Sequence, residues 1–256
     1  MKGMDDALPM LSPALAPEIE ALARRHARAG GPAIAVMTRL GGSLERSLAA
    51  LPAGVRSRVG EITERALRAS WTLADAGGRA LPQAGRRGSM VAAVASGAAG
   101  GAGGLATSLA ELPVTVTVIL HAIRAEAVAA GYDPADPAIR AECLKVFAAG
   151  SPVAADDGVD TSFLSARLTL TGPALQQLIQ RVAPRLATAL SQKLAAQAVP
   201  VLGAAAGAAL NAAYLRYYRE LAAIRFALLR LSERHGVEPV LLAFTAAATP
   251  PPVTRA

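Results

Sequence analysis

The sequence predicts an all-α protein: a single multi-helix bundle with two Gly/Ala-rich apolar helical segments packed in its core. Hydrophobic residues make up 53% of the chain but aromatic residues only 4%, and alanine is the most abundant of the hydrophobic residues. Alanine is the strongest helix former, and β-branched residues are few. Two long stretches, 88–110 and 194–215, contain no charged residue. Since small side chains bury little area each, stability must come from many close helix–helix contacts.

Apolar periodicity and the Gly and Pro residues divide the chain into elements. Residues 1–17, with three prolines, are predicted to be a flexible lead-in, and the Pro-rich end, 246–256, a disordered tail. Between them we predict one helical domain, 18–245. Its expected helices cover 18–29, 33–40, 43–51, 55–75, the first charge-free stretch, 105–130, 136–149, 173–199 and 200–232, with an acidic loop at 150–160.

Glycine spacing predicts how the two charge-free stretches pack. In the pairs Gly97/Gly101 and Gly100/Gly104 the residues are four apart, so they lie on one helix face and permit close approach of another backbone. The predicted helix-packing residues of the two stretches are Gly97, Gly101, Gly104, Gly203 and Gly207.

Both charge-free stretches are long enough to cross a bilayer, which takes about 20 apolar residues. Few of their side chains are strongly apolar, however. Between Val91 and Ala110 the valines and leucines contribute about −2 kcal/mol in total, and Glu111 within a shifted span would cost about 2.5–3.5 kcal/mol. We therefore expect a buried helical hairpin. A stable span, and a hairpin that inserts in only one state, are the open alternatives.

Composition and motifs argue against several classes of function. The net charge is +7, but the arginines flank the apolar middle and do not form the dense basic stripe with aromatics that nucleic-acid binding needs. An anionic membrane surface would attract such a chain, and a solvated Arg-rich surface explains the charge equally well. The glycine run lacks the lysine of a P-loop, and no nucleophile elbow or zinc-ligand spacing occurs. We predict no nucleic-acid partner, no cofactor and no metal site.

A sparse set of polar residues within the apolar helices forms the candidate polar site. Glu111 is costly in such a segment unless it is paired. His121 lies too far along the same helix to reach it, so a partner from another helix is expected, and Asn211 and Tyr214 are candidates. The carboxylate then either makes a structural bond or has a ligand or catalytic role. Glu111, Asn211, Tyr214 and His121 make up the predicted site, with no catalytic residue assigned.

Two further features bear on the environment of the chain. The single cysteine, Cys143, excludes an intrachain disulfide and lies in a helical phrase where a buried core position is expected. The acidic N-terminus lacks the apolar segment of a secretory signal. We expect a cytoplasmic protein, or one peripheral to the inner face of the cell membrane.

Three phrases resemble one known family in their order and spacing. They are Gly104-Leu-Ala-Thr-Ser-Leu-Ala-Glu-Leu-Pro113 leading to Gly131-Tyr-Asp-Pro, the segment 198–211 with Pro200, Gly203, Gly207 and Asn211, and Tyr217-Tyr-Arg-Glu-Leu-Ala222. They resemble the EcsC protein family over roughly residues 45–237. The matching positions are Glu111, Pro113, Gly131, Tyr132, Asp133, Pro200, Gly203, Gly207 and Asn211.

The resemblance implies a cellular location and a process, but no chemical reaction. The family takes its name from a product of a bacterial operon that also encodes an ABC transporter, and it supplies no catalytic residues to carry over. It implies a non-catalytic accessory at the cytoplasmic membrane face, linked to transport or envelope processes, with a membrane surface, a membrane-transporter subunit or a lipid as partner. The alternatives are a hydrolase of lipid or peptide that uses Glu111, and a carrier of an apolar ligand.

Overall fold

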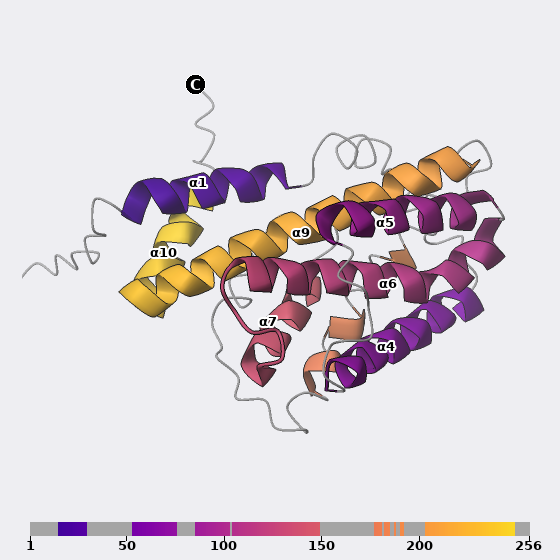
Figure 1. Cartoon of the computed structure of the whole chain (residues 1–256), viewed down its shortest axis with the longest axis horizontal. Coiled ribbons are helices and arrows are strands. Elements are labelled where there is room, and N and C mark those ends of the chain that lie inside the picture. The colour runs from indigo at the N-terminus through magenta and orange to yellow at the C-terminus, as the bar shows by residue number, and fades with distance from the viewer. Residues whose placement is uncertain are drawn as a thin grey trace, which may run out of the picture.

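The computed structural model describes residues 15–29, 53–75, 85–102, 104–148, 203–248 and, between them, 177–180, 182–184, 187, 190 and 191 (Figure 1). These residues are almost entirely helical and include no strand, which confirms the all-α prediction. The predicted helices 33–40 and 43–51, the acidic loop 150–160 and residues 249–256 of the predicted tail lie outside the described residues.

Three long helices form the centre of the protein. α5 (Gly85–Ala102) and α6 (Gly104–Ala129) are consecutive and antiparallel, and both pack against the first part of α9 (Gly203–His235) (Figure 1). The described part of the first charge-free stretch lies in α5 and the start of α6, and residues 203–215 of the second lie at the start of α9. Charge-free faces can pack together here because no charge has to leave water.

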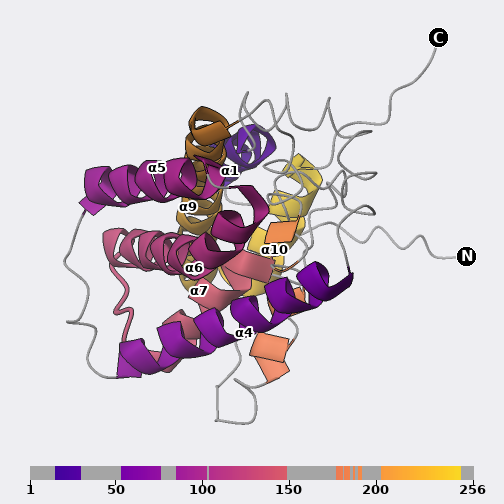
Figure 2. The same cartoon turned by 90° about the vertical axis from the view of Figure 1, so that its right-hand side faces the viewer.

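Two further helices complete the main core. α4 (Ala53–Asp75) packs against α6 on the side opposite α5, so that α5, α6 and α4 lie at successive heights in Figure 2. It buries Val59 and Leu67 and exposes Arg58 and Arg65, as an amphipathic helix should. α7 (Pro137–Ala148) packs against α6 and α9 and buries Phe147 completely. From the segment 177–191 the core receives Leu178, Ile179, Val182, Ala183 and Leu190.

The two outermost described helices build a second, smaller apolar cluster. α1 (Leu15–Arg28) and α10 (Val237–Ala248) pack against one another and against the later part of α9. α1 starts inside the predicted lead-in, since Pro17 falls in its first turn, where proline costs no hydrogen bond. The sequence reading assigned no helix to α10. Gly236, with a φ of +88°, ends α9 and lets the chain turn into it.

α6 is the described helix that is long and apolar enough to cross a membrane. Its segment Thr107–Ala129 has a mean hydropathy of 1.5, and half of the tested window is buried inside the protein. α6 contacts α4, α5, α7 and α9, as the central helix of a bundle does. Length and composition alone do not separate such a core helix from a membrane span.

Candidate functional site

The closest helix contact in the described structure joins α5 and α9 through two glycines. A Cβ atom on Gly97 would lie 2.3 Å from the carbonyl oxygen of Gly207 and 2.9 Å from Cβ of Asn211. Neither distance leaves room for a side chain. One turn further along α5, a Cβ on Gly100 would lie 2.8 Å from Oε2 of Glu111. We call this contact region of α5, α6 and α9 the glycine seam. Only glycine allows these backbones to approach so closely.

Glu111 lies inside the glycine seam, 7% exposed. Its Oε1 accepts a hydrogen bond of 2.6 Å from Nδ2 of Asn211 on α9, and a short one from the Thr115 hydroxyl one turn along α6. Its Oε2 packs against Gly100. The structure thus brings together Glu111 and Asn211 of the predicted polar site, from positions 100 residues apart. Bonds to an ionised acceptor are among the stronger ones in proteins.

Asn211 is 3% exposed and links all three helices. Its Nδ2 donates to Glu111 and also to the hydroxyl of Ser96 on α5, at 3.1 Å, so both amide hydrogens are used. These two acceptors fix the orientation of the amide, because the reverse orientation would place Oδ1 against the carboxylate. Oδ1 has no hydrogen-bond donor among the described residues. The polar bonds of the glycine seam therefore hold α5, α6 and α9 in register at the cost of one unsatisfied oxygen.

The other predicted site residues lie elsewhere. Tyr214 is fully buried one turn along α9, with its ring 6.5 Å from that of Tyr218. His121 lies ten residues beyond Glu111 on α6, a rise of about 15 Å, so the structure does not bring it to the seam. Burial, helped by nearby Arg124, lowers the pKa of His121.

The predicted packing glycines divide in the same way. The buried glycines of α5 are Gly97 and Gly100, three residues apart, whereas Gly101 is half-buried. Residues three apart in a helix lie on the same side, as residues four apart do. Here the residue three positions after Gly97, Gly100, is the one that packs against Glu111. The burial and contacts of Gly104 and Gly203 are outside what the structure describes.

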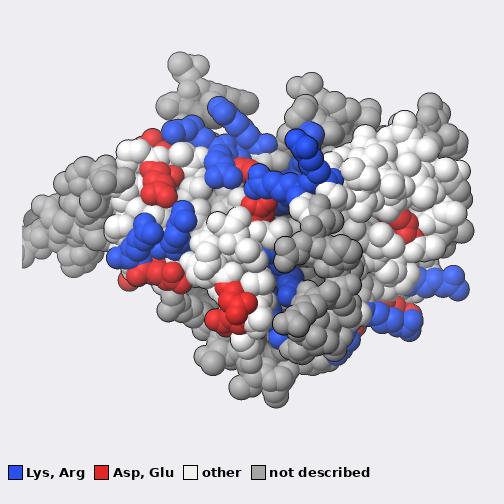
Figure 3. All heavy atoms as spheres, in the orientation of Figure 1, with Lys and Arg blue, Asp and Glu red and all other residues white. Residues whose placement is uncertain are grey.

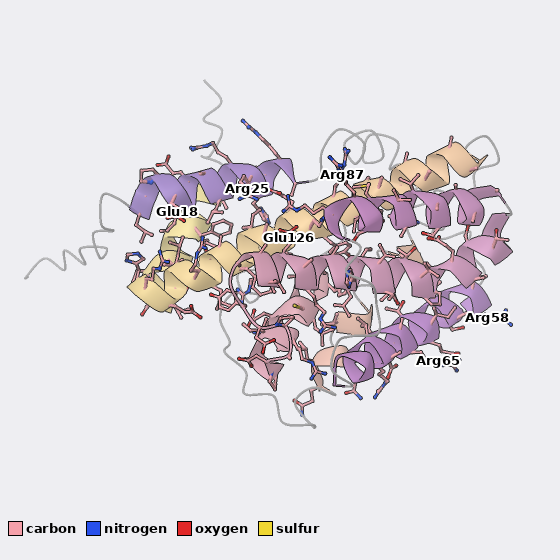
Figure 4. All side chains as sticks on the ribbon, viewed as in Figure 1. Glu18, Arg25, Arg58, Arg65, Arg87 and Glu126 are labelled. Atoms are coloured by element: carbon pink, nitrogen blue, oxygen red, sulfur yellow. The ribbon has the colours of Figure 1, made fainter. Side chains whose placement is uncertain are left out.

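Charged residues from four helices meet where α1 ends and α5 begins. Glu126 of α6 is 5% exposed on its side chain and accepts two hydrogen bonds of 2.8 Å from Arg86. Nε of Arg219, on α9, lies 3.5 Å from the same carboxylate. Arg25 of α1 binds Glu220 at 2.6 Å. Figure 4 labels Arg25, Arg87 and Glu126, which come from three different helices around this junction.

We call Arg25, Arg28, Arg86, Arg87 and Arg219 the arginine cluster. Five arginines against the carboxylates of Glu126 and Glu220 leave a net charge of +3 (five minus two). Arg28 and Arg87 are exposed and have no ion-pair partner among the described residues. Blue side chains gather over the facing ends of α1 and α5 in Figure 3. The cluster is therefore a surface with unneutralised positive charge.

The pKa values of two of these arginines show how the cluster is built. The hydrogen bond to Glu220 raises the pKa of Arg25, and the Glu126 carboxylate adds to the effect. Burial lowers the pKa of Arg219, while Glu126 opposes that shift. Both guanidinium groups stay charged at any physiological pH, because the ordinary arginine pKa is above 12. The two carboxylates thus position the arginines without cancelling them.

Sequence reasoning missed the arginine cluster. Its members come from positions 25 to 219, so no short segment of the chain is strongly basic. The one local signal was Arg86-Arg87 at the start of an apolar helix, where the macrodipole disfavours cations and an acidic residue would be usual. Arg86 and Arg87 do not stabilise the helix end at which they lie, so we interpret them as residues with a role outside the helix.

The described residues offer little for metal or thiol chemistry. No three His, Cys, Asp or Glu side chains among them are placed to hold one metal ion. Cys143 is buried, and burial raises the pKa of its thiol to about 12, so it stays protonated at neutral pH.

Comparison with known proteins gives one match. The sequence model of the EcsC protein family matches residues 66–231, which include α5, α6, α7 and most of α9. Both the glycine seam and the greater part of the arginine cluster lie within the matched residues, whereas α1 and α10 lie outside them. Searches of the curated proteins and of the solved structures gave no match.

Proposed function

The chain belongs to the EcsC protein family, and we propose that it is a non-catalytic accessory that binds the anionic, cytoplasmic surface of a membrane through the arginine cluster. The observation that carries the proposal is the net charge of +3 held at one junction of α1, α5, α6 and α9. Association with a transport or envelope process, as the family resemblance implies, belongs to the same proposal.

The chemistry of the arginine cluster suits phosphate. A guanidinium group presents several N–H donors in one plane. It is more weakly hydrated than an ammonium group, so its desolvation costs less free energy when it binds an oxyanion. Each arginine near an anionic lipid surface contributes about 1 kcal/mol. Arg28 and Arg87 are free to make such contacts, whereas Arg86 and Arg219 are tied to Glu126 and supply charge.

A lipid surface fits the cluster better than a nucleic acid does. Binding of single strands relies on aromatic side chains between the cations, on which bases can stack. Among the described residues, no exposed aromatic side chain lies between the five arginines: Tyr214 and Tyr218 of α9 are fully buried and Tyr217 is half-buried. The charge is also not continued along a groove, since the surface beyond Arg87 on α5 is apolar.

Flotation with vesicles tests the proposal. The purified chain should float with vesicles of phosphatidylcholine and phosphatidylglycerol, should stay behind with phosphatidylcholine alone, and should be released by salt. The double variant Arg28→Gln, Arg87→Gln removes two unpaired charges. At about 1 kcal/mol each, it should weaken binding to anionic vesicles by roughly 10- to 30-fold.

The matched control is Arg58→Gln. Arg58 is exposed on α4, away from the arginine cluster (Figure 4). This variant should bind within about twofold of the parent chain, because the one charge that it removes lies on another face. Equal binding to neutral vesicles, or equal weakening by Arg58→Gln, would overturn the proposal. Binding to a membrane-transport subunit without any affinity for lipid would replace it with a protein partner.

A further inference from the structure

We propose that α5 lies along the membrane surface and that its outer face, Arg87, Val91, Val94, Ala98 and Ala102, enters the lipid headgroup region. The inference rests on the proposed membrane binding and specifies which element makes the contact. It is drawn from the exposure of α5, from its attachment to α9 and from the arginines in its first turn.

The outer face of α5 is apolar beyond its first turn. Arg87, Val91, Val94 and Ala98 follow one another at steps of three or four residues and so lie on one side of the helix. Val91 is 68% exposed and Val94 is 39% exposed. The opposite side carries the buried residues of the helix, Ser89, Ala93, Gly97 and Gly100. The exposed valines are therefore not part of the core.

Beyond the first turn of α5, the neighbouring described surface is also free of charge. The described residues of α6 up to Ala110 and of α9 up to Leu215 include no charged side chain, and Ala204, Ala205 and Ala209 of α9 are exposed. In Figure 3 the part of the molecule that holds α5 and the first halves of α6 and α9 is largely white, and the blue arginines border it at one end. A continuous apolar surface of this kind marks a contact site.

The glycine seam keeps α5 attached while its outer face makes contact. Gly97 lies directly against Gly207, and Asn211 binds Ser96 of α5 at 3.1 Å. The carbonyl of Gly100 accepts hydrogen bonds of 3.0 and 2.9 Å from Thr107 and Ser108 of α6. These contacts hold the inner face, so α5 is presented as a fixed ridge.

The order of charge and apolar residues along α5 selects a lipid surface as the occupant. Interfacial helices combine cations that bind phosphate with apolar side chains that reach the acyl boundary. Arg87 begins the same face that Val91 and Val94 continue, and it belongs to the arginine cluster. With an anionic bilayer, one end of α5 meets the headgroups while the valines lie below them. A purely apolar protein groove would leave Arg87 without a counter-charge.

Site-specific fluorescence tests the inference with the whole chain. Single cysteines replace Val91 or Val94 and carry an environment-sensitive nitrobenzoxadiazole label. The control positions are Val128 on α6 and Val237 on α10, which are 56% and 42% exposed. Cys143 is buried with a pKa of about 12 and should not react, and a Cys143→Ala background verifies this. On phosphatidylglycerol vesicles, labels at 91 and 94 should shift to the blue and be quenched by brominated lipid.

The controls separate the two proposals. Labels at Val128 and Val237 should keep their aqueous spectrum. If the chain floats with anionic vesicles while the labels at 91 and 94 stay aqueous, α5 is not the contact and the inference is wrong, although membrane binding stands. If the chain does not float, membrane binding itself is wrong.

A substitution gives an independent readout. Val91→Asp places an anion on the outer face and should weaken vesicle binding at least tenfold, since the lipid phosphates repel it and its desolvation is costly. Val237→Asp, at an exposed valine on another helix, should change binding by less than about twofold. Equal effects of the two substitutions would contradict the proposed orientation.

Discussion

The two halves of α9 pack by opposite means. In its first half, Gly207 and Asn211 let α5 approach until the backbones touch, and no large side chain intervenes. From Tyr218 onward, rings fill the space: the ring centroids of Phe147 on α7 and Tyr218 are 5.3 Å apart, and those of Tyr132 and Phe226 are 5.7 Å apart. One continuous helix of 33 residues thus packs through its backbone near one end and through large aromatic side chains, which we call anchors, towards the other.

Polar groups follow the same division. The first half of α9 buries a carboxylate held by the amide of Asn211. The second half buries charges: Nε of Arg225 donates to Glu142 of α7 at 2.7 Å, and Lys145 donates to the same carboxylate at 2.9 Å. Large rings and ion pairs fix α7 to α9 by size and charge, whereas the glycine seam depends on the absence of side chains. The comparison predicts that opposite substitutions damage the two halves.

The largest effect should come from removing an anchor in the second half. Phe147 is fully buried, so Phe147→Ala leaves a cavity between α7 and α9 and should cost about 3–5 kcal/mol of unfolding free energy. Urea denaturation followed by circular dichroism measures the loss. Val128→Ala, at an exposed position, is the control and should change stability by less than about 0.5 kcal/mol. A loss below 1 kcal/mol for Phe147→Ala would show that this contact is not an anchor.

Adding one methyl group should damage the first half. Gly97→Ala would place Cβ 2.3 Å from a backbone carbonyl that no side-chain rotation can move, and should cost about 1–3 kcal/mol. The matched variant is Gly60→Ala on α4, where a Cβ would meet no atom within 4 Å. It should instead raise stability by up to about 1 kcal/mol through helix propensity. If both variants stabilise the protein, the close contact of α5 and α9 is absent in solution.

The smallest of the three effects should come from the carboxylate of the glycine seam. Glu111→Gln keeps the shape but replaces the carboxyl group that accepts hydrogen bonds from Asn211 and Thr115 by an amide, and should cost about 1 kcal/mol. Thermal melting measures this loss of stability, and the control is Glu61→Gln at an exposed position of α4. The alternative of a hydrolase makes a different prediction: unchanged stability together with loss of a lipid- or peptide-cleaving activity.

Much of the helical pattern could be predicted from local sequence. The amphipathic order of Val59 and Leu67 against Arg58 and Arg65 placed α4, and the proline at the first turn placed α7. The predicted helix 105–130 corresponds to α6, which runs through Pro113, an exposed residue inside the helix. α10 was missed because twelve largely apolar residues carry no polar face from which a helical period can be read.

The glycine seam and the arginine cluster differ in how far the sequence could predict them. Glu111 and Asn211 could be singled out because polar residues are rare in charge-free helices, and such residues need partners. The arginine cluster could not, because Arg25, Arg86 and Arg219 are ordinary surface arginines when each is seen alone. Glu126, the carboxylate that Arg86 and Arg219 share, lies on α6, and only the packing of α5, α6 and α9 brings it to both arginines.

The sequence by itself determined the helical class, the two charge-free stretches and the scarcity of catalytic groups, since these follow from residue type and short spacing. The tertiary structure decided which glycines touch another backbone, which amide meets Glu111 and where the arginines gather. Each of these depends on the relative height and rotation of helices that are distant in the chain. Local propensity carries no information about such a register, because it is set by the packing of side chains between helices.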